Sequence, residues 1–302
     1  MYHFCTISTA DHLYKAFALY DSLVEIDKNA FLHILCVDKA KVDVSGRNIR
    51  IYQLNEIKIL SSALNVIEKY SGNKDKLRWS LKPVFLTLLL QTEADKVIYL
   101  DNDIYFFGSY HFLFDLLNEH DFLLTPHYYS TNPNKEQNWF EANYRVGLYN
   151  AGFVGVAKSA LKYLIWWTEC CAYRCEKNSL RGMFDDQKYL DLIPVINERA
   201  YIVRHKGCNV ADWNRSEVPR SEKGGQLYLA EKDPLVFIHF NYTTIRAIEQ
   251  GREPFLKPMY EKYFSNIQKY APSIIRAEMY GEDGLKEKLK YKIWKIVTDI
   301  GI

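Results

Sequence analysis

The chain lacks any apolar run long enough to cross a membrane. Its longest apolar stretch, VFLTLLL at 84–90, falls far short of the roughly 20 residues that a spanning helix needs. The first residues, MYHFCTIS, have neither the basic region nor the apolar region of a secretory signal peptide. We therefore expect a cytoplasmic protein.

Cysteine is scarce, and its spacing forms no pattern. None of the six cysteines belongs to a zinc-binding repeat or a disulfide framework. Reduced thiols of this kind are typical of the cytoplasm. The six are Cys5, Cys36, Cys170, Cys171, Cys175 and Cys208.

Neither sign of charge is in excess. The 39 Lys and Arg against 37 Asp and Glu give a formal net charge of +2, so we expect no nucleic-acid partner. The 302 residues, 48% of them hydrophobic, suit one large globular domain or two small ones. Aromatic residues make up 15%, which serves either core packing or stacking against sugar rings and bases.

Short apolar runs alternate with segments of helical period. The runs at 2–8, 31–38, 49–54, 96–100, 121–126, 150–156, 200–205 and 235–240 are predicted strands. Helices are predicted at 11–26, with Asp11 as N-cap, at 80–93, with Pro83 in the first turn, at 159–177, and from Asp185 onward. This order predicts an α/β fold with a mainly parallel sheet flanked by helices.

Two segments stand apart from this alternation. The polar, aromatic stretch 127–147 is too long for an ordinary connector and is a candidate active-site flap. After residue 250, GREPFLKP resembles a hinge, and a Lys-rich segment at 285–302 has the pattern of a basic amphipathic helix with Trp294. That helix either lies on an anionic membrane surface or docks on its own domain.

Two acids follow the strand KVIYL directly. Asp101 and Asp103 would lie at the carboxyl end of the strand, where ligands bind in open α/β sheets. Two carboxylates so placed suit Mg²⁺ or Mn²⁺, which prefer oxygen ligands and leave positions open for phosphate. The alternative is that they are turn formers, a common role of aspartate at strand ends.

Six segments, in order, resemble one family. They are FCTISTADHLYKAFALYDSL, RWSLKPVFLTLLL, KVIYLDNDIYFFGSYHFLFDL, YNAGFVGVAK, DDQKYLDLI and FIHF. They resemble the retaining nucleotide-sugar glycosyltransferases related to glycogenin and to bacterial lipopolysaccharide glycosyltransferases, glycosyltransferase family eight, which share the Rossmann-like GT-A fold. The resemblance extends over about the first 240 residues. Together with the hinge after residue 250, it predicts a GT-A catalytic domain over residues 1–250 and a C-terminal helical extension over 251–302.

The resemblance also implies roles for individual residues. The metal ligands would be Asp101, Asp103 and His239. The nucleotide sugar would be bound by Thr6, Ser8, Asp11, Lys82, Asp101, Asn102, Asn150 and Gly152. The catalytic residues would be Lys82, Asn150, Asp186 and Gln187.

Each role has an ordinary structural alternative. His239, flanked by apolar residues, suits a core histidine, and Lys82 suits a solvated helix position. Asn150 and Gly152 are typical turn residues. Asp185 and Asp186 suit a helix N-cap pair.

One departure from the family follows His239. The family carries a glycine there and, further on, a lysine that contacts the diphosphate. This chain has HFNYTTIRAIEQG instead, so Thr243, Thr244 or Arg246 would have to replace that lysine. The segments GCNVADWNRSE and PLVFIHF resemble a looser set of bacterial polysaccharide-assembly transferases.

The implied activity is transfer of a hexose from a nucleotide diphosphate sugar, UDP-hexose first, to a glycan or lipid-linked acceptor in bacterial surface polysaccharide synthesis. Retention of configuration is implied by the resemblance, and if the enzyme inverts, Asp186 or Glu141 becomes the candidate base. Mn²⁺ or Mg²⁺ would be the cofactor. Two other functions stay open, a metal-dependent phosphohydrolase and a non-catalytic module that binds nucleotide sugars. The expected location is the cytoplasm, with the inner face of the plasma membrane as a possible peripheral site through residues 285–302.

Overall fold

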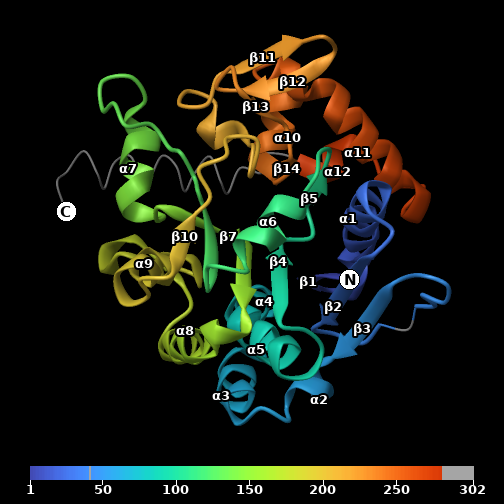
Figure 1. Ribbon diagram of the computed structural model, residues 1–302, viewed down its shortest axis with the longest axis vertical. Helices are drawn as coiled ribbons and strands as arrows, with labels where there is room; N and C mark the ends of the chain where they lie inside the picture. The colour runs from blue at the N-terminus through green and yellow to red at the C-terminus, as the bar shows by residue number, and fades with distance from the viewer. Residues whose placement is uncertain (41, 281–302) are drawn as a thin grey trace.

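A seven-stranded sheet forms the centre of the molecule (Figure 1). The computed structural model describes residues 1–40 and 42–280. The strand order is β10-β6-β7-β4-β1-β2-β3. β7 runs antiparallel to β4 and β6, and the other neighbours are parallel. The predicted mixed, mainly parallel sheet is therefore confirmed. Its strands are β1 (Tyr2–Ser8), β2 (Ala30–Cys36), β3 (Ile49–Gln53), β4 (Lys96–Leu100), β6 (Phe122–Pro126), β7 (Tyr149–Ala157) and β10 (Ala200–Ile202).

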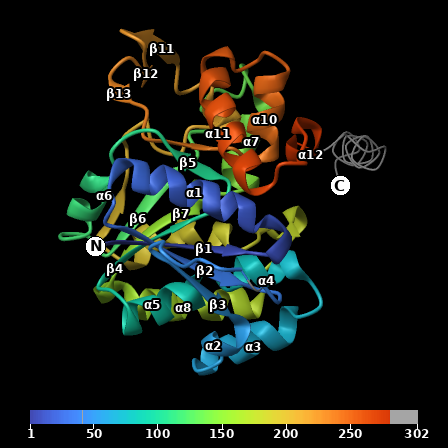
Figure 2. The same ribbon diagram turned by 90° about the vertical axis from the view of Figure 1, so that its right-hand side faces the viewer.

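Helices cover both faces of this sheet, which explains why its strands are continuously apolar. Successive side chains of a strand point to opposite faces, so Phe4 and Cys5 of β1 belong to two different core clusters. Figure 2 shows α1 on one face and α3, α5 and α8 on the other. Their bounds are α1 (Leu13–Ile26), α3 (Ser61–Tyr70), α5 (Lys82–Thr92) and α8 (Leu161–Tyr173).

The remaining helices surround this layered core. α6 lies near the amino end of β4, where Phe114 and Asp115 line one hollow with Lys96, and α10, α11 and α12 gather at one end of the molecule (Figure 2). The bounds are α2 (Leu54–Ile57), α4 (Lys74–Ser80), α6 (His111–Leu116), α7 (Gln137–Arg145), α9 (Ile193–Ile196), α10 (Tyr242–Glu249), α11 (Lys257–Tyr270) and α12 (Arg276–Tyr280).

Three small sheets complete the fold. β5 (Ile104–Phe106) pairs antiparallel with β14 (Phe237–His239), so the last predicted strand lies outside the main sheet. β11 (Arg220–Lys223), β12 (Gln226–Leu229) and β13 (Asp233–Pro234) form a meander at the same end as α10 and α11 (Figure 1). β8 (Lys177–Asn178) and β9 (Met183–Phe184) form a short hairpin.

Helix starts differ from two predictions. Pro83 lies in the first turn of α5, as expected, but Asp11 is not the N-cap of α1. It lies inside a 3-10 turn at Ala10–His12 that precedes this helix, and no side chain caps either start. The segment after Asp186 is a 3-10 helix, Gln187–Leu192, and Asp186 makes no capping hydrogen bond. Asp186 therefore occupies the N-cap position without capping an N–H, which leaves its carboxylate available to the site.

The segment after residue 250 packs on the body of the protein. In α11, Tyr270 donates a hydrogen bond to Asp21 of α1 at 2.9 Å, and Asn266 donates one to the hydroxyl of Tyr105 at 3.2 Å. The domain division at residue 250 stays a prediction, and residues 285–302 lie outside the described residues. Within 1–40 and 42–280, no helix combines the length and hydropathy that crossing a membrane requires.

Candidate active site

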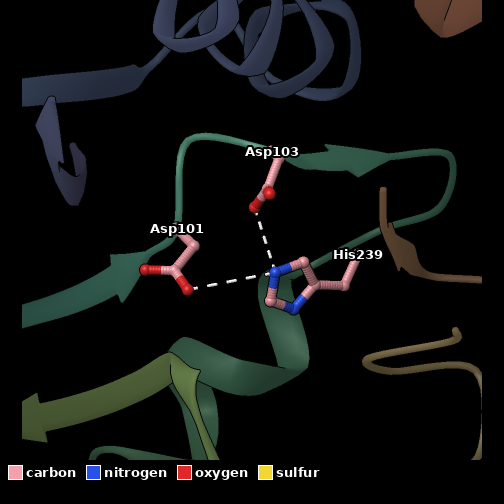
Figure 3. Close-up of side chains that lie close together, drawn as sticks. All are labelled: Asp101, Asp103 and His239. Atoms are coloured by element: carbon pink, nitrogen blue, oxygen red, sulfur yellow. Dashed lines mark ion pairs between the residues drawn. The ribbon is translucent and has the colours of Figure 1, made fainter. Parts of the chain in front are cut away.

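Asp101, Asp103 and His239 converge at the carboxyl end of β4 (Figure 3). His239 Nε2 lies 3.0 Å from Asp103 Oδ1 and 3.9 Å from Asp101 Oδ2. One ligand atom from each residue lies within 4.8 Å of the others, a spacing that can hold a metal ion. Two carboxylate oxygens and one imidazole nitrogen form a donor set that suits Mn²⁺ or Mg²⁺.

The pairing of β5 with β14 brings His239 to the acids. His239 stands opposite Ile104 in this ladder, and the N–H of Phe240 donates to the carbonyl of Asp103 at 2.8 Å. This backbone hydrogen bond joins two segments far apart in the chain right next to the imidazole.

Burial and charge act in opposite directions on the pair. Burial lowers the pKa of His239, but Asp103 outweighs it and the pKa is raised. Burial likewise raises the pKa of Asp103, but His239 outweighs it and the pKa is lowered. The two side chains therefore stabilise each other's charged forms. A divalent cation at this position competes with the imidazole proton, so its affinity rises with pH.

Gly152 of β7 lies directly against the candidate metal ligands. A Cβ atom there would lie 2.6 Å from His239 Cε1 and 2.8 Å from Asp101 Oδ2. The absence of a side chain is what allows the strand to pass so close under two of the three candidate ligands. The N–H of Asp101 donates to the carbonyl of Gly152 at 2.8 Å, which fixes the separation.

Lys82 forms a buried ionic network beside this group. Its ammonium lies 3.3 Å from Asp101 Oδ1 and 3.2 Å from Asp186 Oδ2, and it donates to the carbonyl of Ala151 at 3.0 Å. Burial lowers the pKa of Lys82, but Asp101 and Asp186 together raise it above its usual value. The solvated-helix alternative for Lys82 is therefore wrong, because this ammonium is buried and charged.

Asp186 has an unusual protonation balance. Burial raises its pKa to about 7, because Lys82 offsets only part of the cost of burying the carboxylate. Its backbone carbonyl accepts a hydrogen bond from Trp167 Nε1 at 2.9 Å. The preceding residue, Asp185, holds a φ of 49°, a region rarely adopted by non-glycine residues and often found at functional sites.

Asn150 and Gln187 are held together by backbone and side-chain contacts. Gln187 Oε1 accepts from the N–H of Ala151 at 3.0 Å, and Gln187 Nε2 donates to the carbonyl of Val146 at 3.3 Å. Asn150 Oδ1 accepts from the N–H of Gly152 at 2.9 Å. Both amides therefore have one fixed orientation.

These side chains line one cavity of about 380 Å³. From the predicted set, the lining includes Lys82, Asp101, Asp103, Asn150, Gly152, Asp186, Gln187 and His239. Four other predicted residues are not part of this lining. Thr6, Ser8 and Asn102 are buried, with Asn102 Nδ2 donating to Ser8 Oγ at 3.1 Å, and Asp11 is exposed. Their roles stay predictions.

The cavity also contains residues that the sequence did not single out. Its walls include Trp79, His127, Tyr129, Trp139, Lys177 and Trp213. Tyr129 stacks on Trp139 with ring centroids 5.3 Å apart, and Trp213 packs edge-to-face on His239 at 5.3 Å. The aromatic stretch 127–147 was the available signal, although part of it forms α7.

The sequence has relatives without an assigned activity. No protein-family model matches the chain. Two Bacillus subtilis proteins of uncharacterised function, YfnF and YfnD, are similar over nearly their whole length. YfnF is 27% identical over 287 residues, covering 87% of this chain and 92% of YfnF. YfnD is 26% identical over 310 residues, covering 95% of both.

Two solved glycosyltransferases have a similar fold. Galactosyltransferase LgtC in complex with donor and acceptor sugar analogs matches with a TM-score of 0.53 at 13% identity, covering 78% of this chain and 86% of LgtC. Mouse xyloside xylosyltransferase 1 matches with a TM-score of 0.50 at 14% identity, covering 80% of this chain and 98% of that one. The expected GT-A fold is thereby confirmed.

Proposed function

We propose that the protein is a metal-dependent glycosyltransferase that transfers a hexose from a nucleotide diphosphate sugar, with UDP-hexose as the donor. The observation that carries the proposal is one cavity that joins the Asp101, Asp103 and His239 group to the buried ion pair of Lys82 and Asp186. The similarity of fold to LgtC and to xyloside xylosyltransferase 1 supports it.

Mn²⁺ or Mg²⁺ fits the three candidate ligands. Two of the donor atoms are hard carboxylate oxygens and the third is a borderline imidazole nitrogen. The three lie within 4.8 Å of one another, and the glycine beneath them leaves the ligand side chains room. A divalent ion bound there supplies positive charge to the diphosphate as it departs.

The buried residues of the cavity would bind and orient the donor sugar. Lys82 would reach its phosphates or hydroxyls, while Asn150 and Gln187 would contact the sugar. Asp186 would stabilise positive charge that develops on the ring. In a retaining reaction the acceptor attacks from the face that the diphosphate leaves, and the departing phosphate oxygen takes the proton.

The two candidate bases of an inverting reaction, Glu141 and Asp186, are less well placed than the groups that a retaining reaction requires. Glu141 lies on α7 in an ion pair with Arg145 at 3.5 Å. Asp186 is next to the candidate metal ligands, and Lys82 binds it on one side. We therefore propose retention, which comparison of the anomeric configuration of donor and product by NMR would test.

The nucleoside and the diphosphate of the donor also need binding residues. Thr6, Ser8, Asp11 and Asn102, at the ends of β1 and β4, would lie around the uridine and its ribose. For the diphosphate, Thr243 lines the cavity, whereas the Thr244 hydroxyl accepts from the N–H of Asp212 at 3.2 Å. Thr243 is therefore the better replacement for the lysine that the family carries.

The acceptor would be a glycan or a lipid-linked oligosaccharide in bacterial surface polysaccharide synthesis, used in the cytoplasm at the inner face of the plasma membrane. The Lys-rich sequence at 285–302 is the basis for membrane contact. Vesicles containing anionic phospholipid should retain the full chain and release a chain that ends at residue 284. Equal retention of both would exclude this role for the segment.

The decisive experiment follows the hydrolysis of a panel of UDP-hexoses with and without Mn²⁺. Native protein should turn over one of them only with the metal, Asp103→Asn should lose this turnover, and Asp95→Asn, at an exposed site, should keep it. A phosphohydrolase would instead cleave p-nitrophenyl phosphate. A binding module would be stabilised by a UDP-sugar and release no product.

A further inference from the structure

His127 lies in the wall of the cavity and hydrogen-bonds through both ring nitrogens. Its side chain is almost fully buried, with 2% of the residue exposed. Nδ1 is 3.0 Å from the carbonyl oxygen of Gly147, and Nε2 is 3.1 Å from Asn150 Nδ2. The backbone N–H of His127 also donates to the carbonyl of Leu148 at 2.9 Å, which anchors the residue.

The carbonyl of Gly147 determines the tautomer. A carbonyl oxygen only accepts, so Nδ1 must carry the proton. In the neutral ring, Nε2 is then an acceptor. Burial lowers the pKa of His127 to about 3, so the ring is neutral throughout the physiological pH range.

This tautomer determines the orientation of the Asn150 amide. An acceptor at Nε2 requires the NH₂ of Asn150 to face His127, and the amide oxygen then faces the N–H of Gly152 at 2.9 Å. If the amide turned over, oxygen would face a lone pair and NH₂ would face an N–H. Both buried hydrogen bonds would be lost, a strongly unfavourable exchange.

The hydrogen bonds continue to the candidate metal ligands. Asn150 Oδ1 holds the N–H of Gly152, and the carbonyl of Gly152 holds the N–H of Asp101 at 2.8 Å. A Cβ atom added to Gly152 would lie only 2.5 Å from Asn150 Oδ1 and 2.8 Å from Asp101 Oδ2. The amide oxygen of Asn150 is therefore fixed near Asp101.

Aromatic rings prevent His127 from rotating. Tyr129 stacks on its imidazole with centroids 4.5 Å apart and planes inclined by 8°. Trp213 packs edge-to-face against it at 5.6 Å. Packing alone would suit any buried ring of this size, but it does not explain a hydrogen-bond partner on each nitrogen.

We propose that His127 is a positioning residue that fixes the amide of Asn150 so that its oxygen lies on the side of Asp101 and accepts a hydrogen bond from a donor-sugar hydroxyl. The Asn150 NH₂ is engaged by His127 and lies 3.5 Å from Gln187 Oε1. The second lone pair of Asn150 Oδ1 therefore remains available to accept a hydrogen bond from a ligand. The role in sugar binding rests on the proposed glycosyltransferase function, whereas the fixed amide does not.

Two substitutions distinguish the role of Nε2 of His127 from the role of Nδ1. Glutamine places a polar atom near Nε2 and can still accept from Asn150, whereas asparagine places one near Nδ1 and cannot. His127→Asn should lower kcat/KM for UDP-hexose hydrolysis about tenfold, the effect of one buried hydrogen bond, and His127→Gln should stay within about threefold of native. His33→Asn, which removes a buried histidine of β2, is the control for loss of a buried imidazole.

NMR of the ¹⁵N-histidine-labelled full chain, with Mg²⁺ in place of Mn²⁺, tests the fixed amide without reference to activity. The proposal expects a neutral His127 protonated at Nδ1 at pH 7, with a Nε2 shift that changes in Asn150→Ala. Protonation at Nε2, or no change in Asn150→Ala, would overturn it, as would equal loss of kcat/KM in the asparagine and glutamine variants. If no nucleotide sugar is turned over, the proposed function fails and the NMR result alone decides whether the amide is fixed.

Discussion

Lys82 and Asp186 form an ion pair of 3.2 Å whose side chains are only 4% and 3% exposed. Removing one member of such a pair leaves the other charge buried without compensation. Lys82→Met should lower the free energy of unfolding at pH 8 by about 3 kcal/mol, measured by urea denaturation. The loss of unfolding free energy should be smaller at pH 6, because Asp186, whose pKa is already raised to about 7, is then protonated in the variant and leaves no buried charge uncompensated.

The matched control is Lys158→Met, which breaks the exposed pair of Lys158 with Asp95. Exposed pairs contribute between about 0 and 1 kcal/mol, so this variant should unfold like the native protein at both pH values. Equal losses in both variants would contradict the account of Lys82 as a buried, compensated charge.

Gly152→Ala should disturb the candidate metal ligands directly. The added Cβ would lie 2.6 Å from His239 Cε1 and 2.8 Å from Asp101 Oδ2, so one of these side chains has to move. We expect Mn²⁺ affinity, measured by electron paramagnetic resonance, to fall on the order of 10–100-fold, the range seen when the surroundings of metal ligands are altered.

Gly72→Ala provides the comparison for this prediction. A Cβ at Gly72 meets nothing within 4 Å, so the variant should bind Mn²⁺ like the native protein. Its stability should be unchanged or up to about 1 kcal/mol higher, because alanine restricts the unfolded chain. Native Mn²⁺ affinity in Gly152→Ala would show that the close approach is not required.

Acid should destabilise the protein through its buried histidines. Burial lowers the pKa of His33 and of His127 from 6.5 to about 3. The unfolded chain therefore binds more protons between pH 6.5 and 3. This contribution to stability is complete above 6.5 and is lost as pH falls toward 3. Each histidine should lower the free energy of unfolding by up to about 1.4 kcal/mol for each pH unit of acidification in that window.

Urea denaturation at pH 7.5, 6.5 and 5.5 measures this slope. In His33→Asn the slope between 6.5 and 5.5 should be shallower than in the native protein, because one titrating group has been removed. A variant that retains the native slope would show that His33 does not carry the effect.

Arg220 and Glu253 form a second buried pair, 2.9 Å apart with both side chains 2% exposed. Arg220 also donates to the carbonyl of Ala211 at 2.7 Å and to Asn214 Oδ1 at 3.0 Å, on either side of Trp213. Arg220→Met should therefore lower stability by about 3–5 kcal/mol and change tryptophan fluorescence. Arg50→Met, at a more exposed pair with Glu93, should cost under about 1 kcal/mol. A native-like spectrum in Arg220→Met would exclude the support of Trp213.

The sequence predicted best what depends on neighbouring residues. Continuous apolar runs identified the strands of the main sheet, and Asp101 with Asp103 form a visible pair because one residue separates them. His239 was found only through a family resemblance, since nothing local indicates that β14 will pair with β5.

Other features depend on partners distant in sequence. The hydrogen bond from Asn150 of β7 reaches His127, the residue after β6, beyond a register shift between Leu124 and Pro126, and no periodicity reveals it. The need for glycine at 152 depends on where His239 and Asp101 arrive. The 3-10 turn that displaced Asp11 from its predicted capping position also has a distant partner, because the N–H of Ala10 donates to Asp38 Oδ1 at 2.7 Å.

Because β14 is among the last strands to leave the ribosome and supplies the imidazole, a nascent chain that stops before it already carries both acids but has no third ligand. Coordination by all three residues would therefore begin only once the chain up to β14 has been synthesised and β14 has paired with β5. A fluorescent reporter of bound metal would thus follow the completion of folding during translation.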